Sequence, residues 1–282
     1  MILIGYAAFG EVTMNSKRFF IQCLIAGGSV LCCFTISVAA QGPKPQVPAP
    51  KDLLRKVEEV YAICNSYSDT GVVVTQLIST DGKKSEEKPE NATFTTTFVR
   101  PNSFRFEYRY RHKDKGKRYI IWAKGKEVRT WWDADRQREG KPESLISALK
   151  VATGVTYDAS TAIPRLLLAD PKATRRLANG EPDQLADSTV NDKECTRIRR
   201  KYQAVNFEDG SLFDVLDVYW VEKTTFLVRR IEREMTTPKH AFRTTITYTP
   251  KINEDIPAKA FEFNPPTDES EDTPEKAKEI VR

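Results

Sequence analysis

Strict alternation of aromatic and charged residues is the feature that most constrains how this chain folds. Residues 98–111 read FVRPNSFRFEYRYR, with Phe104, Phe106, Tyr108 and Tyr110 at every second position. Because successive side chains of a β-strand point to opposite faces of its sheet, this pattern predicts a strand with one aromatic face and one wet face. Such a face needs a partner to pack against.

Further segments typical of β-strands follow in series along the chain. Connections such as Arg100-Pro101-Asn102 and Lys124-Gly125-Lys126 are short turns that join antiparallel neighbours. We therefore expect one long antiparallel sheet, and a long twisted sheet curls until it closes or wraps around something. The predicted strands are 70–79, 92–99, 104–110, 118–123, 127–132, 194–203, 214–222, 226–235 and 241–249.

Three segments with helical spacing can pack on this sheet. A helix is predicted from Asp52 to about Asn65, a second over 143–153, and a third over 160–168 with Ser160 as its N-cap. Residues 169–192 are predicted to be irregular. The fold class is therefore α+β, with a curled antiparallel sheet around helices. If the helices fill the concave face, the result is a plain core, and if they fill it partly, the result is an apolar cavity.

The first 40 residues have the pattern of an export signal. Lys17 and Arg18 form a basic segment after Met14, which we take as the true start, and an apolar run follows over 19–37. Small residues at positions 38–40 fit cleavage after Ala40, which would place the protein in the periplasm. The run is also about long enough to span a bilayer, so a retained membrane anchor is the alternative.

Composition outside this signal limits the classes of partner. Proline-rich residues 41–51 are predicted to form an extended linker, residues 52–266 the folded domain and residues 267–282 a charged, flexible tail. Removing the signal lowers the net charge from +5 to about +4. Because acidic and basic residues are so evenly mixed, we expect no nucleic-acid binding.

Two cysteines, Cys64 and Cys195, lie outside the signal. An isolated pair in an exported chain is typical of a disulfide, which is the prediction here. Two buried thiols are the alternative, since the sequence does not show whether the two side chains meet.

Residues that could catalyse a reaction are scarce. His112 and His240 are assigned to solvated loops, and the segment after residue 40 contains none of the common metal, nucleotide or nucleophile motifs. Asp133 and Asp135 alternate with arginines, which is typical of a solvated turn. The sequence therefore predicts no enzyme, no metal site and no cofactor.

Three segments resemble the periplasmic lipoprotein-sorting carriers of the LolA type. In those carriers an arginine-proline-asparagine turn joins two strands and an aromatic residue follows, as in residues 100–104 (RPNSF) here. Residues 119–132 (YIIWAKGKEVRTWW) are similar to a hydrophobic strand, lysine turn and aromatic strand of the family, and residues 261–266 (FEFNPP) to its closing strand. The greater length, the polar insert after Ala169 and the cysteine pair depart from the family.

The resemblance implies a half-open β-barrel whose central helices form a lid over a lipid-binding cavity. It also implies that Arg100 is a latch, which hydrogen-bonds the lid backbone in the closed state and is released by an entering acyl chain. The residues predicted to line the cavity are apolar or aromatic: Phe98, Phe104, Phe106, Tyr108, Trp122, Trp132, Leu149, Ile163, Leu167 and Trp220.

The function implied by the resemblance is that of an exported, monomeric carrier of lipid or lipoprotein acyl chains across the cell envelope. Donor proteins of the inner membrane and acceptor proteins of the outer membrane would be its further partners. The same fold also occurs in lipid-binding lipoproteins and in sensor domains. An envelope sensor or scaffold that binds a protein partner is therefore the alternative.

Overall fold

In the computed structural model the alternating segments form β-strands, and the structure describes residues 48–78, 90–112, 115–133, 138–168, 177, 180–205, 212–236 and 241–265. The helices are α1 (Pro50–Ile63), α2 (Leu145–Ala152), α3 (Ala159–Ala162), α4 (Pro164–Leu167) and the 3-10 helix η1 (Ala258–Phe261). The strands are β1 (Ser66–Ile78), β2 (Glu90–Val99), β3 (Ser103–His112), β4 (Lys115–Lys124), β5 (Glu127–Trp132), β6 (Glu139–Gly140), β7 (Asp183–Val190), β8 (Lys193–Val205), β9 (Leu212–Glu222), β10 (Val228–Thr236), β11 (Ala241–Tyr248) and β12 (Lys251–Ile252). The predicted signal peptide, most of the predicted linker, the predicted tail and His240 lie outside the described residues.

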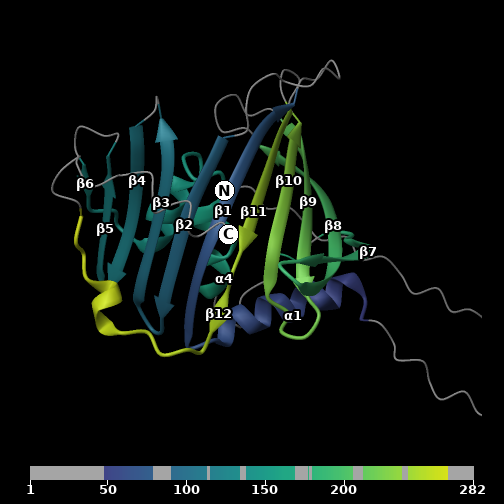
Figure 1. The fold of residues 1–282 in the computed structure, drawn as a ribbon, viewed down its shortest axis with the longest axis horizontal. Helices are drawn as coiled ribbons and strands as arrows, with labels where there is room; N and C mark the ends of the chain where they lie inside the picture. Colours follow the sequence, from purple (N-terminus) through teal and green to yellow (C-terminus); the bar gives the residue numbers. More distant parts are fainter. Residues whose placement is uncertain are drawn as a thin grey trace, which may run out of the picture. The chain divides into compact units, whose positions relative to one another are not determined.

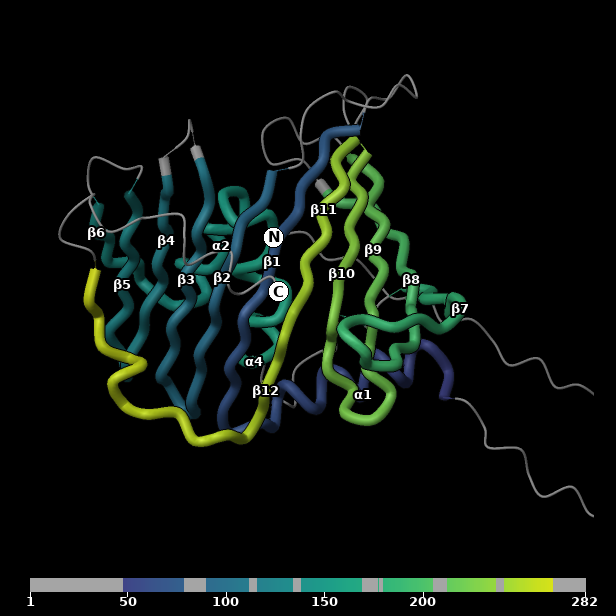
Figure 2. Tube along the Cα trace, viewed as in Figure 1, coloured from purple at the N-terminus to yellow at the C-terminus, as the bar shows by residue number. Residues whose placement is uncertain are grey.

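The strands form one antiparallel sheet in the order β6-β5-β4-β3-β2-β1-β11-β10-β9-β8-β7, and β12 pairs with β1. Among the described strands, β6 and β7 do not pair with each other, so the sheet is not closed. Figures 1 and 2 show the sheet curled, with α2 and α4 behind it and α1 crossing below its strands. The α+β class and the curled antiparallel sheet are thus as predicted.

The face of the sheet that meets the helices is called the inner face. Cross-strand register places Phe94 opposite Tyr108, and Tyr108 opposite Tyr119, so aromatic residues line up across β2, β3 and β4 on this face. Leu54 of α1 and Leu149 of α2 belong to the same buried cluster. The core therefore lies between the sheet and its helices, as the alternation of β3 predicts.

The outer face of β3 to β5 is covered by the segment that follows β12. Trp122 points to this face, where its Nε1 donates a hydrogen bond to the carbonyl oxygen of Phe261 at 2.6 Å and its ring packs on Phe263. The guanidinium of Arg129 lies 5.3 Å from the centre of the Phe263 ring. The FEF segment singled out in the sequence thus covers the sheet from outside, below β5 and β3 in Figure 2.

Several predicted boundaries were wrong for identifiable reasons. Residues 183–190 form the edge strand β7 instead of an irregular segment, because an edge strand with mostly exposed side chains lacks apolar alternation. Its turn to β8 is made by Asn191 and Asp192, both with positive φ, which is the signature of a tight hairpin. The predicted helix over 160–168 is two short helices, since Pro164 cannot donate a backbone hydrogen bond.

Two further assignments also change. Ser160 is not an N-cap: it lies inside α3, buried, and its hydroxyl donates to the carbonyl oxygen of Leu149 at 3.1 Å. His112 is the last residue of β3 instead of a loop residue. None of the described helices is long and apolar enough to cross a lipid bilayer.

Candidate binding site between the sheet and its helices

The inner face of β1 to β5 is lined by aromatic side chains and is called the aromatic half. Its residues Tyr67, Phe94, Phe98, Phe104, Phe106, Tyr108 and Tyr119 are all buried. Neighbouring rings pack on one another, as in Phe94 on Phe106 with centroids 5.9 Å apart and Phe106 on Tyr108 at 6.4 Å. Large rings give much apolar area with few rotatable bonds, so this half offers a rigid apolar floor.

Helices α2, α3 and α4, called the lid helices, cover the aromatic half. The hydroxyl of Ser144 caps α2 by accepting a hydrogen bond from the backbone N–H of Ser147 at 3.1 Å. Leu149, Ile163 and Leu167 point from the lid helices into the core, with 0 to 1% of their surface exposed. These helices are short and separated by turns, so tertiary packing, more than intrinsic helix propensity, holds them in place.

Eight of the ten residues predicted to line a cavity come together here. Phe98, Phe104, Phe106, Tyr108, Leu149, Ile163 and Leu167 belong to one buried cluster, and Trp132 packs against it. Phe104, Phe106 and Leu149 are 0% exposed, which leaves no space for water beside them. In this state the lid helices fill the aromatic half as a plain core, so an acyl chain could enter only if they moved.

Trp122 and Trp220 do not line the inner face, and their assignment to the cavity was wrong. Trp122 packs under the segment after β12, as described above. Trp220 belongs to a small outer cluster with Val190, Cys195 and Val218. In each strand alternate residues point to the inner face, and Trp122 and Trp220 occupy positions between them, so both point to the outer face. Other segments cover them there.

The predicted disulfide between Cys64 and Cys195 was also wrong. Both cysteines are buried free thiols. Cys64 follows α1 in the inner core, whereas Cys195 lies in the outer cluster beside β7, so the sheet separates them. Burial raises the pKa of both thiols, which disfavours the reactive thiolate form.

Arg100 connects the sheet to two helices. Its Nε donates to the carbonyl oxygen of Cys64 at 2.7 Å, and its Nη2 donates to those of Tyr61, at 3.2 Å, and Ala62 at the end of α1. Nη2 also donates to the carbonyl oxygen of Leu167, the last residue of α4, at 3.0 Å. Terminal carbonyls of helices lack partners within the helix, and a guanidinium is a strong donor to them. Arg100 thus contacts the lid backbone, while its role as a latch remains a prediction.

The inner face of β8 to β10 carries a buried ionic network and is called the charged half. The carboxylate of Asp217, 0% exposed, accepts two hydrogen bonds from Arg233, at 2.7 and 3.1 Å, and one from Arg200 at 3.0 Å. The hydroxyl of Tyr219 donates a fourth at 3.1 Å. Burial alone would raise the pKa of Asp217, yet the two guanidinium groups hold that pKa below its usual value.

The charged half also reaches the lid helices. Nη1 of Arg233 donates to the carboxylate of Asp158, at the start of α3, at 2.5 Å. The side chains of Arg233 and Asp158 are 17% and 23% exposed, so this contact lies nearer to solvent than Asp217 does. Asp158 and the preceding Tyr157 both have positive φ, and the Tyr157 hydroxyl hydrogen-bonds Glu90 at 2.8 Å. Arginines therefore contact the lid helices at two points, Arg233 at the start of α3 and Arg100 at the end of α4.

The aromatic half contains one buried carboxylate, that of Asp69. It accepts hydrogen bonds from the Tyr67 hydroxyl at 2.6 Å and from the backbone N–H of Thr96 at 2.9 Å. Burial raises the pKa of Asp69 to about 6, although these two hydrogen bonds oppose the rise. Among the hydrogen bonds of the described residues, none joins Asp69 to an arginine, which is how it differs from Asp217.

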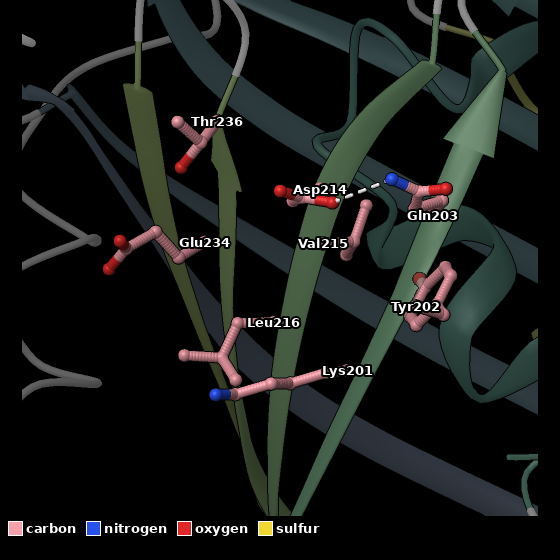
Figure 3. Close-up of a pocket in the computed structure, with 8 residues that line it drawn as sticks. All are labelled: Lys201, Tyr202, Gln203, Asp214, Val215, Leu216, Glu234 and Thr236. Carbon is pink, nitrogen blue, oxygen red and sulfur yellow. Dashed lines mark hydrogen bonds between the residues drawn. The ribbon is translucent and has the colours of Figure 1, made fainter.

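A separate recess lies on strands β8 to β10. It has a volume of about 430 Å³ and is lined by Lys201, Tyr202, Gln203, Asp214, Val215, Leu216, Glu234 and Thr236. Figure 3 shows Gln203 and Asp214 joined across two strands by a hydrogen bond, which measures 3.2 Å. Within the described ranges, no cluster of side chains has the composition of a metal site.

The charged half escaped the sequence analysis, although part of its signal is present. In β9 the inward positions are Val215, Asp217, Tyr219 and Val221, so Asp217 alternates on the same face as apolar residues. In β10, Arg233 has the parity of Ile231 and Met235. A charged residue at a position where the alternation predicts an apolar, inward residue indicates a buried side chain with an oppositely charged partner. No comparable pattern marks Asp158, because it lies in a turn between helices.

Together these features define an α+β protein with an open, curled antiparallel sheet whose inner face is covered by short helices. The chain belongs to the DUF2092 family, described as a predicted periplasmic protein, whose model matches residues 51–271. The predicted periplasmic location agrees with that description. No curated protein matches the sequence.

Three solved structures show a remote likeness to this chain. A DUF1329 family protein from Desulfovibrio piger has 12% identity and a TM-score of 0.34, over 76% of this chain and 96% of that chain. LprF from Mycobacterium bovis has 10% identity and a TM-score of 0.37, over 74% and 94%. A chain of the Pseudomonas aeruginosa MucA/MucB complex has 8% identity and a TM-score of 0.40, over 76% and 61%.

Proposed function

We propose that this protein is an exported carrier that binds lipid or lipoprotein acyl chains between its sheet and its lid helices and moves them across the cell envelope. In this proposal the curled sheet works as a half-open barrel and the structure is its closed, unloaded state. The observation that carries the proposal is the set of hydrogen bonds from Arg100 to the ends of α1 and α4. They fasten the lid helices through polar contacts that can break without disturbing the sheet.

The energetics allow such an exchange. Lifting the lid helices would expose Leu149, Ile163, Leu166 and Leu167, each contributing about 1.5–3 kcal/mol of burial. An acyl chain gains about 0.8 kcal/mol for each methylene that it buries, so a chain of about 16 carbons gains roughly 13 kcal/mol. The two amounts are similar. A guest chain on the aromatic floor can therefore offset displacement of the lid side chains.

Lipid that stays bound during purification tests the carrier proposal. The protein is isolated from its own envelope fraction without detergent and measured by native mass spectrometry, and the lipid is identified after extraction. We expect a mass excess that matches one or two acyl-bearing molecules. A protein that is always empty, but purifies with a stable protein partner, would support the sensor or scaffold alternative.

Substitution of Arg100 tests the latch. Arg100→Leu removes the hydrogen bonds to Leu167 and to the end of α1, so we expect the amides of residues 145–168 to exchange hydrogen at least about tenfold faster. Loading with a fatty acid should also become faster. Arg105→Leu is the matched control, because Arg105 also donates to a backbone carbonyl, that of Glu262 at 2.8 Å, but on the outer face. Equal exchange in both variants would exclude a latch at Arg100.

One observation favours the sensor or scaffold as a second candidate. Phe104, Phe106 and Leu149 are fully buried, as in an ordinary core that never opens. A protein of this kind would bind its partner through an outer surface and would take up no acyl chain. The lipid measurement above separates the two candidates.

A further inference from the structure

Arg233 has two acidic partners of different character. Asp217 lies on the neighbouring strand β9, is 0% exposed and receives bonds from Nε and Nη2 of Arg233. Asp158 lies on the lid helices, is 23% exposed and receives the bond from Nη1. If the lid helices move, Asp217 stays with Arg233 because both belong to the sheet, but Asp158 leaves. Nη1 would then face the opened space without its anion.

Arg200 adds to the positive charge at this point. Its Nη2 donates to Asp217 at 3.0 Å, and its guanidinium lies over the ring of Tyr202, 4.5 Å from the centroid. In the closed state Arg233 pairs with both Asp158 and Asp217, and Arg200 pairs with Asp217. Loss of Asp158 removes one negative charge from beside these two guanidinium groups, so the local charge becomes more positive by one unit. A site of this charge in a poorly hydrated space attracts an anion strongly.

Apolar residues on the inner face connect Arg233 with the hydrophobic core. Ile231 is the next inward residue of β10 after Arg233, and it pairs with Ile246 of β11. Both are 2% exposed and belong to the cluster that contains the aromatic half. A molecule with its charged end at Arg233 could therefore extend its tail along the inner face under the lid helices. This arrangement matches an anionic amphiphile.

We propose that Arg233, supported by Arg200 and Asp217, binds the anionic headgroup of the amphiphile whose acyl chain occupies the inner face. In the closed state the carboxylate of Asp158 occupies the position of this headgroup. This inference rests on the proposed carrier function and names the chemical class of its cargo. A carboxylate and a phosphate group share the required charge and hydrogen-bond acceptors. A free fatty acid or an acidic phospholipid could supply them.

Binding of three single-chain probes tests the site. Affinities of the full chain after export are measured by calorimetry for hexadecanoate, lysophosphatidic acid and lysophosphatidylcholine. We expect both anionic probes to bind at least about tenfold more tightly than the zwitterionic one, because each forms a charged hydrogen bond with Arg233. The tighter of the two anionic probes identifies carboxylate or phosphate as the preferred headgroup.

Asp158→Asn is the decisive variant. It removes the competing charge but leaves Arg233 paired with Asp217, and asparagine tolerates the positive φ of this position. We expect it to bind both anionic probes about threefold to tenfold more tightly and the zwitterionic probe without change. Asp183→Asn is the matched control, since Asp183 on β7 also pairs with an arginine, Arg199 on β8, but in solvent.

The possible outcomes separate the two claims. Equal affinity for all three probes, or no effect of Asp158→Asn on the anionic ones, would overturn the headgroup site and leave the carrier function standing. If none of the three probes binds to the natural protein or to Asp158→Asn, the carrier function is contradicted, and the headgroup site with it.

Discussion

The two halves of the inner face bury very different side chains under the same helices. The aromatic half consists of rings that pack through contact area and need no particular partner. The charged half is held by Asp217, whose carboxylate receives hydrogen bonds from Arg200, Arg233 and Tyr219. Aromatic packing tolerates replacement by another apolar surface, whereas a buried ion network is stable only when complete. The aromatic half can therefore exchange lid side chains for the apolar chain of a guest, whereas the pairs of Asp217 with Arg200 and Arg233 must stay in place.

The two buried aspartates sharpen this comparison. The pKa of Asp69 in the aromatic half is raised to about 6 by burial, and that of Asp217 in the charged half is lowered because two arginines outweigh burial. Asp69 therefore favours its protonated form on folding, and Asp217 its ionised form. The two groups give opposite contributions to the pH dependence of stability.

The largest effect is expected from breaking the ion network. Arg233→Met leaves Asp217 buried with Arg200 and Tyr219 and leaves Asp158 without its partner, so we expect the free energy of unfolding to fall by about 3–5 kcal/mol. Urea unfolding followed by circular dichroism measures this loss. Arg243→Met is the control, because Arg243 pairs with Glu234 in solvent, and its loss should be below about 1 kcal/mol. Similar losses in both variants would mean that the buried network stabilises the fold no more than an exposed ion pair does.

An intermediate effect is expected from pH. The folded state keeps the proton of Asp69 between pH 4 and about 6, where the unfolded chain has lost it, so this group lowers stability by about 3 kcal/mol as pH rises through that window. Asp69→Asn removes this contribution. We expect the variant to gain stability relative to the natural protein from pH 4 to pH 7, measured by urea unfolding. A difference that does not vary with pH would show that Asp69 is ionised throughout.

The smallest effect is expected at a ring hydroxyl of the aromatic half. The hydroxyl of Tyr108 is buried and has no hydrogen-bond partner among the described residues. Tyr108→Phe should therefore leave stability unchanged or raise it by up to about 1 kcal/mol. Tyr67→Phe is the control, since it removes the hydrogen bond to Asp69 and should cost about 1–2 kcal/mol. A clear loss in Tyr108→Phe would reveal a partner for this hydroxyl.

The aromatic half could be predicted from sequence because its pattern is simple. In β3 the inward residues from Phe104 to Tyr110 are aromatic and Arg105, Glu107 and Arg109 point outward, so period-two alternation identifies the buried face. In β8 the run Arg199, Arg200, Lys201 is basic at each position, and alternation does not show that Arg200 points inward. Polarity predicts burial well only where burial needs no specific partner.

Arg100 and Asp158 show the same limit of prediction from sequence. Arg100 could be singled out because it belongs to a short recognisable turn, and its contact with Leu167 follows from where α4 ends. Asp158 meets Arg233 only through the path of the turn before α3, which depends on two residues with positive φ. Such a long-range pair is decided by tertiary structure, and the local sequence does not encode it.

The central claim is that the lid helices move away from the sheet when an acyl chain binds. Spin labels at two exposed positions, Thr70 on β1 and Val151 on α2, allow the separation to be measured by pulsed electron resonance. On addition of hexadecanoate we predict a second, longer distance whose population rises with the bound fraction. An unchanged distance distribution in a sample that is saturated with bound hexadecanoate would contradict the account.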